Sequence, residues 1–176
     1  MSFISNMPPK KIDCAPGDLL NRHLAGAIDL RRQVEQARYN IGPECASIRK
    51  LLEEVAEALD SYSQRLCERA AAFGARETGA VAGDRTRRLG TFGIANDEVE
   101  IDAIAAAIAA FGDASRSAIA EAAASGDVEA CHIFTGLSHE LDYDLWLLES
   151  LSRPLFAGRY WPKCLQTGIS IGAGGV

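Results

Sequence analysis

Few side chains in this sequence have the type and spacing needed to bind a metal or to act as an acid, a base or a nucleophile. Two of its three histidines, His23 and His139, lie on predicted helical faces without a second ligand at a suitable spacing on the same helix, so we expect them to be structural. The five cysteines have no CxxC spacing, which favours reduced thiols over a disulfide framework or a zinc cluster. The glycine-rich segment 168–175 lacks the strand and the helix that a phosphate-binding loop requires. The sequence therefore contains no recognisable nucleophile triad or nucleotide-binding motif.

The composition predicts a single all-α domain. The chain has 176 residues, of which 48% are hydrophobic, a length that suits one well-packed domain and is short for two. Only 7% of the residues are aromatic, and alanine is abundant. Because alanine has the highest helix propensity, this composition favours helices over sheets.

Charge and hydropathy exclude several classes of protein. The formal net charge of -6 argues against general nucleic-acid binding, because neutralising phosphates requires clustered lysine and arginine. We find no run of about 18 apolar residues that would cross a membrane. Residues 1–12 lack the basic start and the apolar run of a secretory signal. We therefore expect a cytoplasmic protein without a membrane partner.

Four segments with apolar residues at three- and four-residue steps predict four long helices. The helices are expected from Leu19 to Tyr39 after an N-cap at Asp18, from Ile48 to about Phe73, from a cap at Asn96 or Asp97 to Ser125, and from Val128 until Pro154 stops the last one. Glycine recurs from Gly74 to Ala95, which predicts a long connection between the second and third helices. Four long helices with one long crossover are typical of a ferritin-like four-helix bundle. We assign residues 18–153 to the bundle, and 1–17 and 154–176 to tails.

Short motifs in these helices make the chain resemble the Dps group of ferritin-like cage proteins. The first predicted helix ends in Gln36-Ala37-Arg38-Tyr39-Asn40, which is similar to the family's Gln-Ala-His-Trp-Asn-like segment. The last helix carries Leu141-Asp142-Tyr143-Asp144-Leu145-Trp146, which resembles the family's Leu-Asp-x-x-Leu-Trp. Glu68-Arg69-Ala70 and Gly126-Asp127 also occur in the family's order, so the resemblance covers residues from about 19 to 151. It implies a hollow shell of twelve four-helix subunits that oxidises ferrous iron with peroxide, stores the ferric mineral and, in some members, coats DNA.

The resemblance also implies an iron-oxidising site between two subunits, made of two histidines and an acid from one subunit and two acids from its neighbour. Carried over residue by residue, the histidine positions are Arg38 and Arg49, the acid beside them is Glu53, and the neighbour's pair is Gln64 and Glu68. Arginine has only donors and stays protonated, so it cannot offer a lone pair to iron. The inherited set supplies two carboxylates at most, whereas ferrous iron favours imidazole and carboxylate ligands together. We therefore predict that the usual ferroxidase centre is lost.

Three interpretations of these positions remain open. Arg38 and Arg49 facing Glu53 and Glu68 would form a charge-balanced cluster between subunits, which we call the intersubunit ion-pair lock. The same side chains could instead be solvated surface charges, with each pair contributing ~0 to 1 kcal/mol. The third interpretation is a relocated iron-oxidising site that uses the surviving acids.

The resemblance singles out two further groups. The acids of the family's threefold pores fall near Asp127, Glu129 and His132, where a ring of copies would concentrate cations. The alternative is that the acids are favoured by the helix macrodipole and that His132 is a surface residue. Tyr39 and Trp146 match aromatic positions that border the iron site in relatives, although packing in the core accounts for them without any chemistry.

The two tails hold the candidate DNA contacts, which are Lys10, Lys11, Arg159 and Lys163. Net charge disfavours DNA binding, and we favour docking of Tyr160-Trp161 onto protein instead. Taken together, the resemblance and the residues predict a homododecameric shell that sequesters iron. Iron inside the shell is the candidate cofactor. The alternatives are an active mini-ferritin with a relocated site, and a structural, DNA-binding or partner-binding shell without iron.

Overall fold

The computed structural model describes residues 16–74 and 96–155, and nearly all of them are helical. The helices are α1 (Pro16–Asn40), the short 3-10 helix η1 (Pro43–Cys45), α2 (Ala46–Ala72), α3 (Asp97–Ser125) and α4 (Val128–Leu155). The described part of the chain is thus an all-α four-helix bundle, which confirms the four long helices predicted from the sequence. The tail residues Lys10, Lys11, Arg159 and Lys163 lie outside the described residues.

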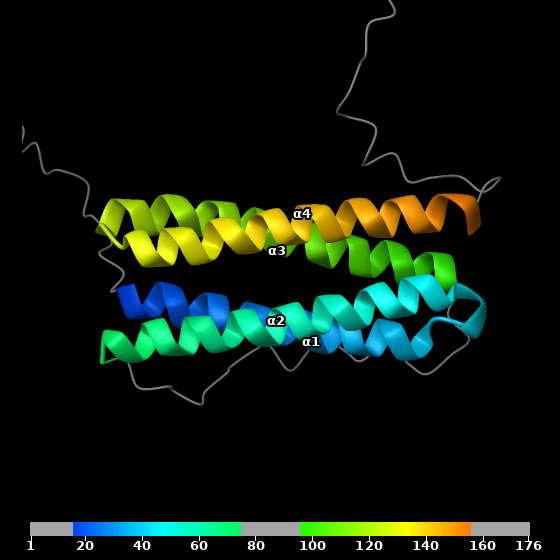
Figure 1. Ribbon diagram of the computed structural model, residues 1–176, viewed down its shortest axis with the longest axis horizontal. Helices are drawn as coiled ribbons and strands as arrows, with labels where there is room; N and C mark the ends of the chain where they lie inside the picture. The colour runs from blue at the N-terminus through cyan, green and yellow to red at the C-terminus, as the bar shows by residue number, and fades with distance from the viewer. Residues whose placement is uncertain (1–15, 75–95, 156–176) are drawn as a thin grey trace, which may run out of the picture.

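The direction of each helix in Figure 1 explains why a long connection is needed. Helices α1 and α2 run in opposite directions, as do α3 and α4, whereas α2 and α3 run in the same direction. The end of α2 and the start of α3 therefore lie at opposite ends of the bundle. Since α2 has 27 residues, the connection must cover about 40 Å. Most of its residues lie outside the described part.

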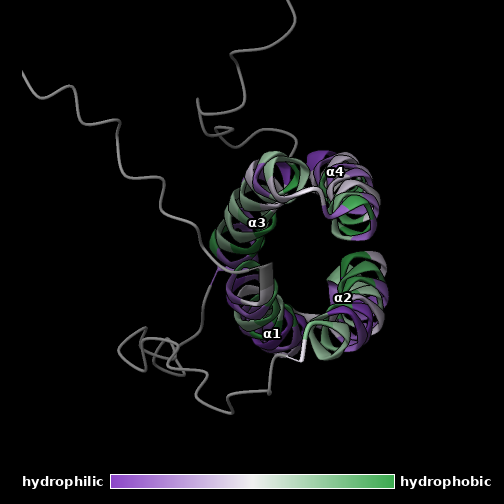
Figure 2. Ribbon diagram, turned by 90° about the vertical axis from the view of Figure 1, so that its left-hand side faces the viewer, coloured by the Kyte–Doolittle hydropathy of each residue, from purple (hydrophilic) through white to green (hydrophobic). Residues whose placement is uncertain are grey.

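The apolar faces of the four helices meet along the centre of the bundle. Seen along its axis in Figure 2, α1 lies beside α2 and α3, and α4 lies beside the same two helices. Most of the apolar residues on the predicted helix faces are buried, whereas Val128 at the start of α4 is 64% exposed. The largest fully buried side chains include Phe134, Leu20, Ile48, Leu52, Leu59, Leu66 and Ile108. Burial of such side chains contributes about 1.5–3 kcal/mol each, which makes this core the main source of stability.

Side-chain and glycine caps define the ends of α3 and the turn that follows it. The Asn96 side chain accepts a hydrogen bond from the backbone N–H of Glu98, which confirms one of the two predicted caps. Gly126 ends α3 in the left-handed conformation, with φ of 77°, which glycine adopts without a Cβ penalty. These signals fix the short turn into α4.

Two predicted helix ends were wrong, by three residues at the start of α1 and by two residues at the end of α4. Helix α1 begins at Pro16, so Asp18 lies inside its first turn and is not the N-cap. Proline suits the first position of a helix because its fixed φ is already helical and no hydrogen-bonding N–H is lost there. Helix α4 continues through Pro154 to Leu155, because a proline so close to the end removes few hydrogen bonds of the ladder.

Helix α3 is more apolar than the sequence pattern alone suggested. Among the described helices it is long and apolar enough to cross a membrane by length and composition, a weak criterion that core helices also meet. Its Ile101, Ile104, Ile108 and Phe111 side chains are buried in the bundle. Alanine raises the mean hydropathy of its remaining faces. The helix is therefore packed as a core element of the bundle.

Candidate functional site

The positions predicted to correspond to the family's histidines, Arg38 and Arg49, meet at the junction of α1 and α2. Arg38 lies in the last turn of α1, and its Nη1 is 3.5 Å from Oε1 of Glu53 on α2. Arg49, one turn before Glu53, donates a hydrogen bond from Nε to the backbone carbonyl oxygen of Arg38 at 3.2 Å. The two guanidinium groups and one carboxylate thus belong to a single local arrangement within one subunit.

Arg38 also contacts the neighbouring tyrosine. Its Nη2 donates to the Tyr39 hydroxyl at 3.2 Å, and its guanidinium carbon lies 4.8 Å from the centre of the ring. The Arg38 side chain is 26% exposed, whereas Tyr39 is 73% exposed. The cation therefore lies between a carboxylate and an aromatic ring that the single subunit leaves uncovered.

The turn that positions this arrangement is fastened to the start of α3. Asp97 accepts hydrogen bonds from the backbone N–H of Gly42 at 3.1 Å and from the thiol of Cys45 at 3.6 Å. Asn40 donates to the Glu100 carboxylate at 3.0 Å. These contacts hold the end of α1 and the start of α2 in register, so that Arg38 and Arg49 meet.

The other two positions form a separate pair on α2. Gln64 donates from Nε2 to Oε1 of Glu68 at 3.0 Å, and both side chains are exposed. Gln64 follows Glu53 by eleven positions, which corresponds to about 16 Å along a helix. The structure therefore does not bring Gln64 and Glu68 to Arg38 within one chain.

This donor set does not fit iron. Within residues 16–74 and 96–155, no group of three or more histidine, cysteine, aspartate or glutamate side chains is arranged to hold a metal ion. Both histidine positions carry guanidinium groups, which have no lone pair to donate. The Glu53 carboxylate at this position is already paired with a cation.

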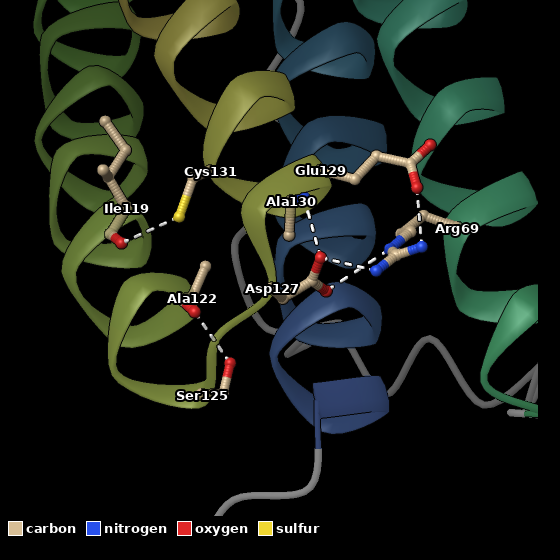
Figure 3. Close-up of polar contacts among 8 residues, drawn as sticks. All are labelled: Arg69, Ile119, Ala122, Ser125, Asp127, Glu129, Ala130 and Cys131. Atoms are coloured by element: carbon tan, nitrogen blue, oxygen red, sulfur yellow. Dashed lines mark hydrogen bonds and ion pairs between the residues drawn. The ribbon is translucent and has the colours of Figure 1, made fainter.

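Asp127, the first of the predicted pore residues, is held by Arg69 of α2. Figure 3 shows the Arg69 guanidinium facing the Asp127 carboxylate. The two groups make two hydrogen bonds, Nη2 to Oδ1 at 2.7 Å and Nε to Oδ2 at 3.4 Å. Asp127 is only 6% exposed, and its Oδ1 also accepts the backbone N–H of Ala130, so it caps the start of α4.

The pKa of Asp127 reflects this double role. Burial acts to raise the pKa of the carboxyl, but the hydrogen bonds from Arg69 and Ala130 and the charge of Arg69 outweigh burial and hold the pKa below its usual value. Asp127 is therefore a neutralised structural carboxylate within the subunit.

The other two pore residues differ from Asp127 in exposure. Arg69 also donates from Nη1 to the Glu129 carboxylate at 2.6 Å, but the Glu129 side chain is 64% exposed. His132 is exposed one turn further along α4. The guanidinium carbon of Arg69 lies 4.6 Å from the centre of the Phe73 ring, so one cation joins the end of α2 to the start of α4.

Sequence reasoning missed the role of Arg69. In the sequence it stands only as the middle residue of the matching tripeptide Glu68-Arg69-Ala70. The sequence did contain a signal for this contact. A cation in the last turn of a helix and an acid in the first turn of a helix are each stabilised by the helix macrodipole, and Arg69 and Glu129 hold these positions. Pairing them required knowing that these two helix ends meet, which only the tertiary structure shows.

The aromatic residue Trp146 lies on the exposed face of α4. Trp146 is 58% exposed and stacks on Tyr143, with ring centres 5.9 Å apart. The expectation that Tyr39 and Trp146 are explained by core packing was therefore wrong for a single subunit. The core positions of both helices are filled by smaller aliphatic residues and by Phe134.

Asp144, between these two aromatic residues in sequence, is a half-buried carboxyl close to other acids. Burial and the charges of Glu140 and Glu54 raise its pKa to about 6. Glu54 on α2 and Glu140 on α4 thus lie near Asp144, and Glu54 is also paired with Lys50 at 3.7 Å.

Comparison with known proteins agrees with the bundle and its motifs. No protein-family model matches the chain. A DNA protection during starvation protein of Agrobacterium fabrum is 32% identical over 138 residues, which are 75% of this chain and 84% of that protein. A Dps N-terminal deletion mutant from Mycobacterium smegmatis superposes with a TM-score of 0.67 and 19% identity, over 78% of this chain and 93% of the other.

A second solved structure gives the same result for the fold. The Dps protein of Vibrio cholerae O1, described as a member of a broad superfamily of ferritin-like diiron-carboxylate proteins, has a TM-score of 0.64 at 18% identity. The match covers 76% of this chain and 86% of that one. With one relative above 30% identity along most of its length, and with the same bundle in the solved structures, the chain belongs to the Dps family of ferritin-like proteins.

Proposed function

We propose that this chain is the subunit of a Dps-type shell that sequesters iron without the usual intersubunit ferroxidase centre. The observation that carries the proposal is the arrangement of Arg38, Arg49 and Glu53, in which two guanidinium groups occupy the positions of imidazole ligands and one of them neutralises the remaining acid. A bound ferrous ion would have to displace a cation and would find no nitrogen ligand there.

In the assembled shell, the same arrangement would extend across the subunit interface. Tyr39 is exposed beside Arg38, and Glu68 is exposed on α2. A neighbouring chain that brought Glu68 against the arginines would complete the intersubunit ion-pair lock. Such a cluster would replace bound metal as the source of charge balance at the interface.

The carboxylates of Glu54, Glu140 and Asp144, which are not arranged as a ligand set for a metal ion, support iron storage in place of oxidation. Asp144 lies near Glu140 and Glu54 closely enough for their charges to raise its pKa. Carboxylates concentrate ferrous and ferric ions by charge even where the full ligand set of an oxidation centre is missing. Protection of DNA, which the name of the Agrobacterium relative describes, would then follow from withholding iron.

Addition of ferrous iron and peroxide to the purified protein tests the proposal. We expect ferric absorbance to rise no faster than in buffer, while iron remains with the protein after gel filtration, because storage requires carboxylates but rapid oxidation requires the lost centre. The matched control is the Glu53→Gln variant, which should oxidise iron as slowly as the original chain.

Rapid oxidation that Glu53→Gln abolishes would contradict the proposal and would favour a relocated oxidation site. Failure of iron to remain with the protein would instead favour a shell that does not handle iron.

A further inference from the structure

The bundle core contains one histidine that no part of the proposed function uses. His23, on α1, is 6% exposed and is surrounded by the other three helices. Buried histidines are uncommon without a polar partner, because the ring loses its hydration. Its contacts therefore determine which protonation state the core accepts.

Ser115 of α3 fixes the hydrogen bonding of this histidine. The Ser115 hydroxyl donates to the backbone carbonyl oxygen of Phe111 at 2.9 Å, so its single hydrogen is already used. His23 Nε2 lies 3.1 Å from the Ser115 oxygen and must therefore donate to it. This contact is satisfied by a neutral imidazole that carries its hydrogen on Nε2.

Aromatic rings cover the rest of the imidazole. Phe111 of α3 stacks on it at 5.0 Å between ring centres, and the edge contact with Phe134 of α4 is at 4.7 Å. Tyr62 of α2 approaches at 6.3 Å, and its buried hydroxyl has no hydrogen-bond partner among the described residues. A neutral ring suits this apolar environment, whereas a cation would lack hydration.

Charged groups around the core do not offer the imidazole a direct ion pair. On α1 the neighbouring Arg22 disfavours a second positive charge, and on α3 Glu121 opposes that effect. Arg22 and Glu121 are already paired with each other at 2.9 Å, on the surface. On α2 the nearby groups are Tyr62 and Arg65, and α4 contributes the uncharged Phe134.

We propose that His23 is a pH-sensitive switch in the bundle core: the neutral imidazole holds α1 against α3, and acid weakens the packing of all four helices because the folded core resists protonation of this ring while the unfolded chain does not. The switch goes beyond the proposed function, because it depends neither on iron nor on the shell.

The direction of the pH effect follows because the buried site favours the neutral imidazole over the imidazolium cation. Burial, with a smaller contribution from Arg22, lowers the pKa of His23 from 6.5 to about 4. The stabilisation is therefore fully present above the unfolded value and is lost as the pH falls from about 6.5 towards 4. For this group alone, the unfolding equilibrium constant rises about 20-fold between pH 7 and 5 and about 100-fold between pH 7 and 4.

Denaturant unfolding of the full chain between pH 7 and 4 tests the switch. His23→Gln keeps an amide N–H for Ser115 but cannot take up a proton, so its unfolding constant should lack the 20-fold increase seen for the original chain at pH 5. The control is His139→Gln, which replaces an exposed histidine of α4 and should follow the original profile. Other acid-sensitive groups are common to all three proteins and cancel in the comparison.

Parallel pH profiles of the original chain and His23→Gln would overturn the proposal. If His23→Gln does not fold, titration of the imidazole in the original chain by NMR decides the matter. A His23 ring that stays neutral with its hydrogen on Nε2 down to about pH 5 supports the switch, and a ring that titrates near 6.5 overturns it.

Discussion

At the scale of single residues, two arginines pair with the acids of the candidate sites. Arg38, at a position predicted to correspond to a metal ligand, pairs with Glu53 at 3.5 Å, and the loss of the oxidation chemistry that we propose rests on this substitution. Arg69 neutralises Asp127 and contacts Glu129, so two of the three predicted pore residues are already engaged inside the subunit. Glu129 is exposed although it is paired with Arg69, and His132 is the exposed member of the three predicted pore residues that Arg69 does not contact.

Arg69→Ala should lower the free energy of unfolding by about 2–3 kcal/mol, because it leaves the buried Asp127 carboxylate without its charged donor. Denaturant unfolding at pH 7 measures the loss. The pair stabilises the fold above the usual aspartate pKa and is lost as the pH falls through the lowered value, so the variant should also lose less stability in acid.

The control for Arg69 is Arg22→Ala. Arg22 pairs with Glu121 on the surface, with side chains 56% and 48% exposed, so its removal should cost less than about 1 kcal/mol. Equal losses for the two variants would show that the contact with Asp127 is an ordinary surface pair.

At the scale of elements, helix ends and close approaches fix how the four helices pack. Asp97 ties the α1–α2 turn to the start of α3, and Arg69 ties the end of α2 to the start of α4. Between these ends, Gly26 of α1 allows the Phe111 ring of α3 to come close. A Cβ at Gly26 would lie 2.9 Å from that ring.

Gly26→Ala should therefore destabilise the bundle by about 1–2 kcal/mol, because crowding of Phe111 outweighs the gain of roughly 1 kcal/mol in helix propensity. Gly136→Ala in α4 is the matched control, since a Cβ added at Gly136 would have no neighbouring atom of the subunit within 4 Å. Thermal unfolding should show opposite shifts for the two variants, and a stabilised Gly26→Ala would contradict the close approach.

At the scale of the whole molecule, the exposed aromatic residues indicate that the subunit is not complete by itself. Tyr39, Tyr143 and Trp146 are large apolar side chains left more than half exposed. Exposed apolar groups of this kind commonly mark interfaces. Assembly of twelve 18.8 kDa chains would give a shell of about 226 kDa.

Light scattering should find this mass for the original chain and a smaller one for Arg38→Ala, because the variant leaves Glu53, and in the proposed lock also Glu68 of the neighbouring chain, without the Arg38 cation. Arg32→Ala, an exposed arginine on the same helix, is the control and should assemble normally. Unchanged assembly and thermal stability of Arg38→Ala would contradict the intersubunit ion-pair lock.

The sequence by itself determined the four helices and the bundle, because apolar spacing, the cap at Asn96 and the glycine at Gly126 are local signals that act within a few residues. It also determined that Arg38 and Arg49 cannot ligate metal, since that follows from the chemistry of guanidinium. Only the tertiary structure decided that Asp127 is paired with Arg69, and that His23 is enclosed by Ser115 and three aromatic rings. These contacts join residues 58 and 92 positions apart, and such pairs are selected by how the helices pack and not by any local pattern.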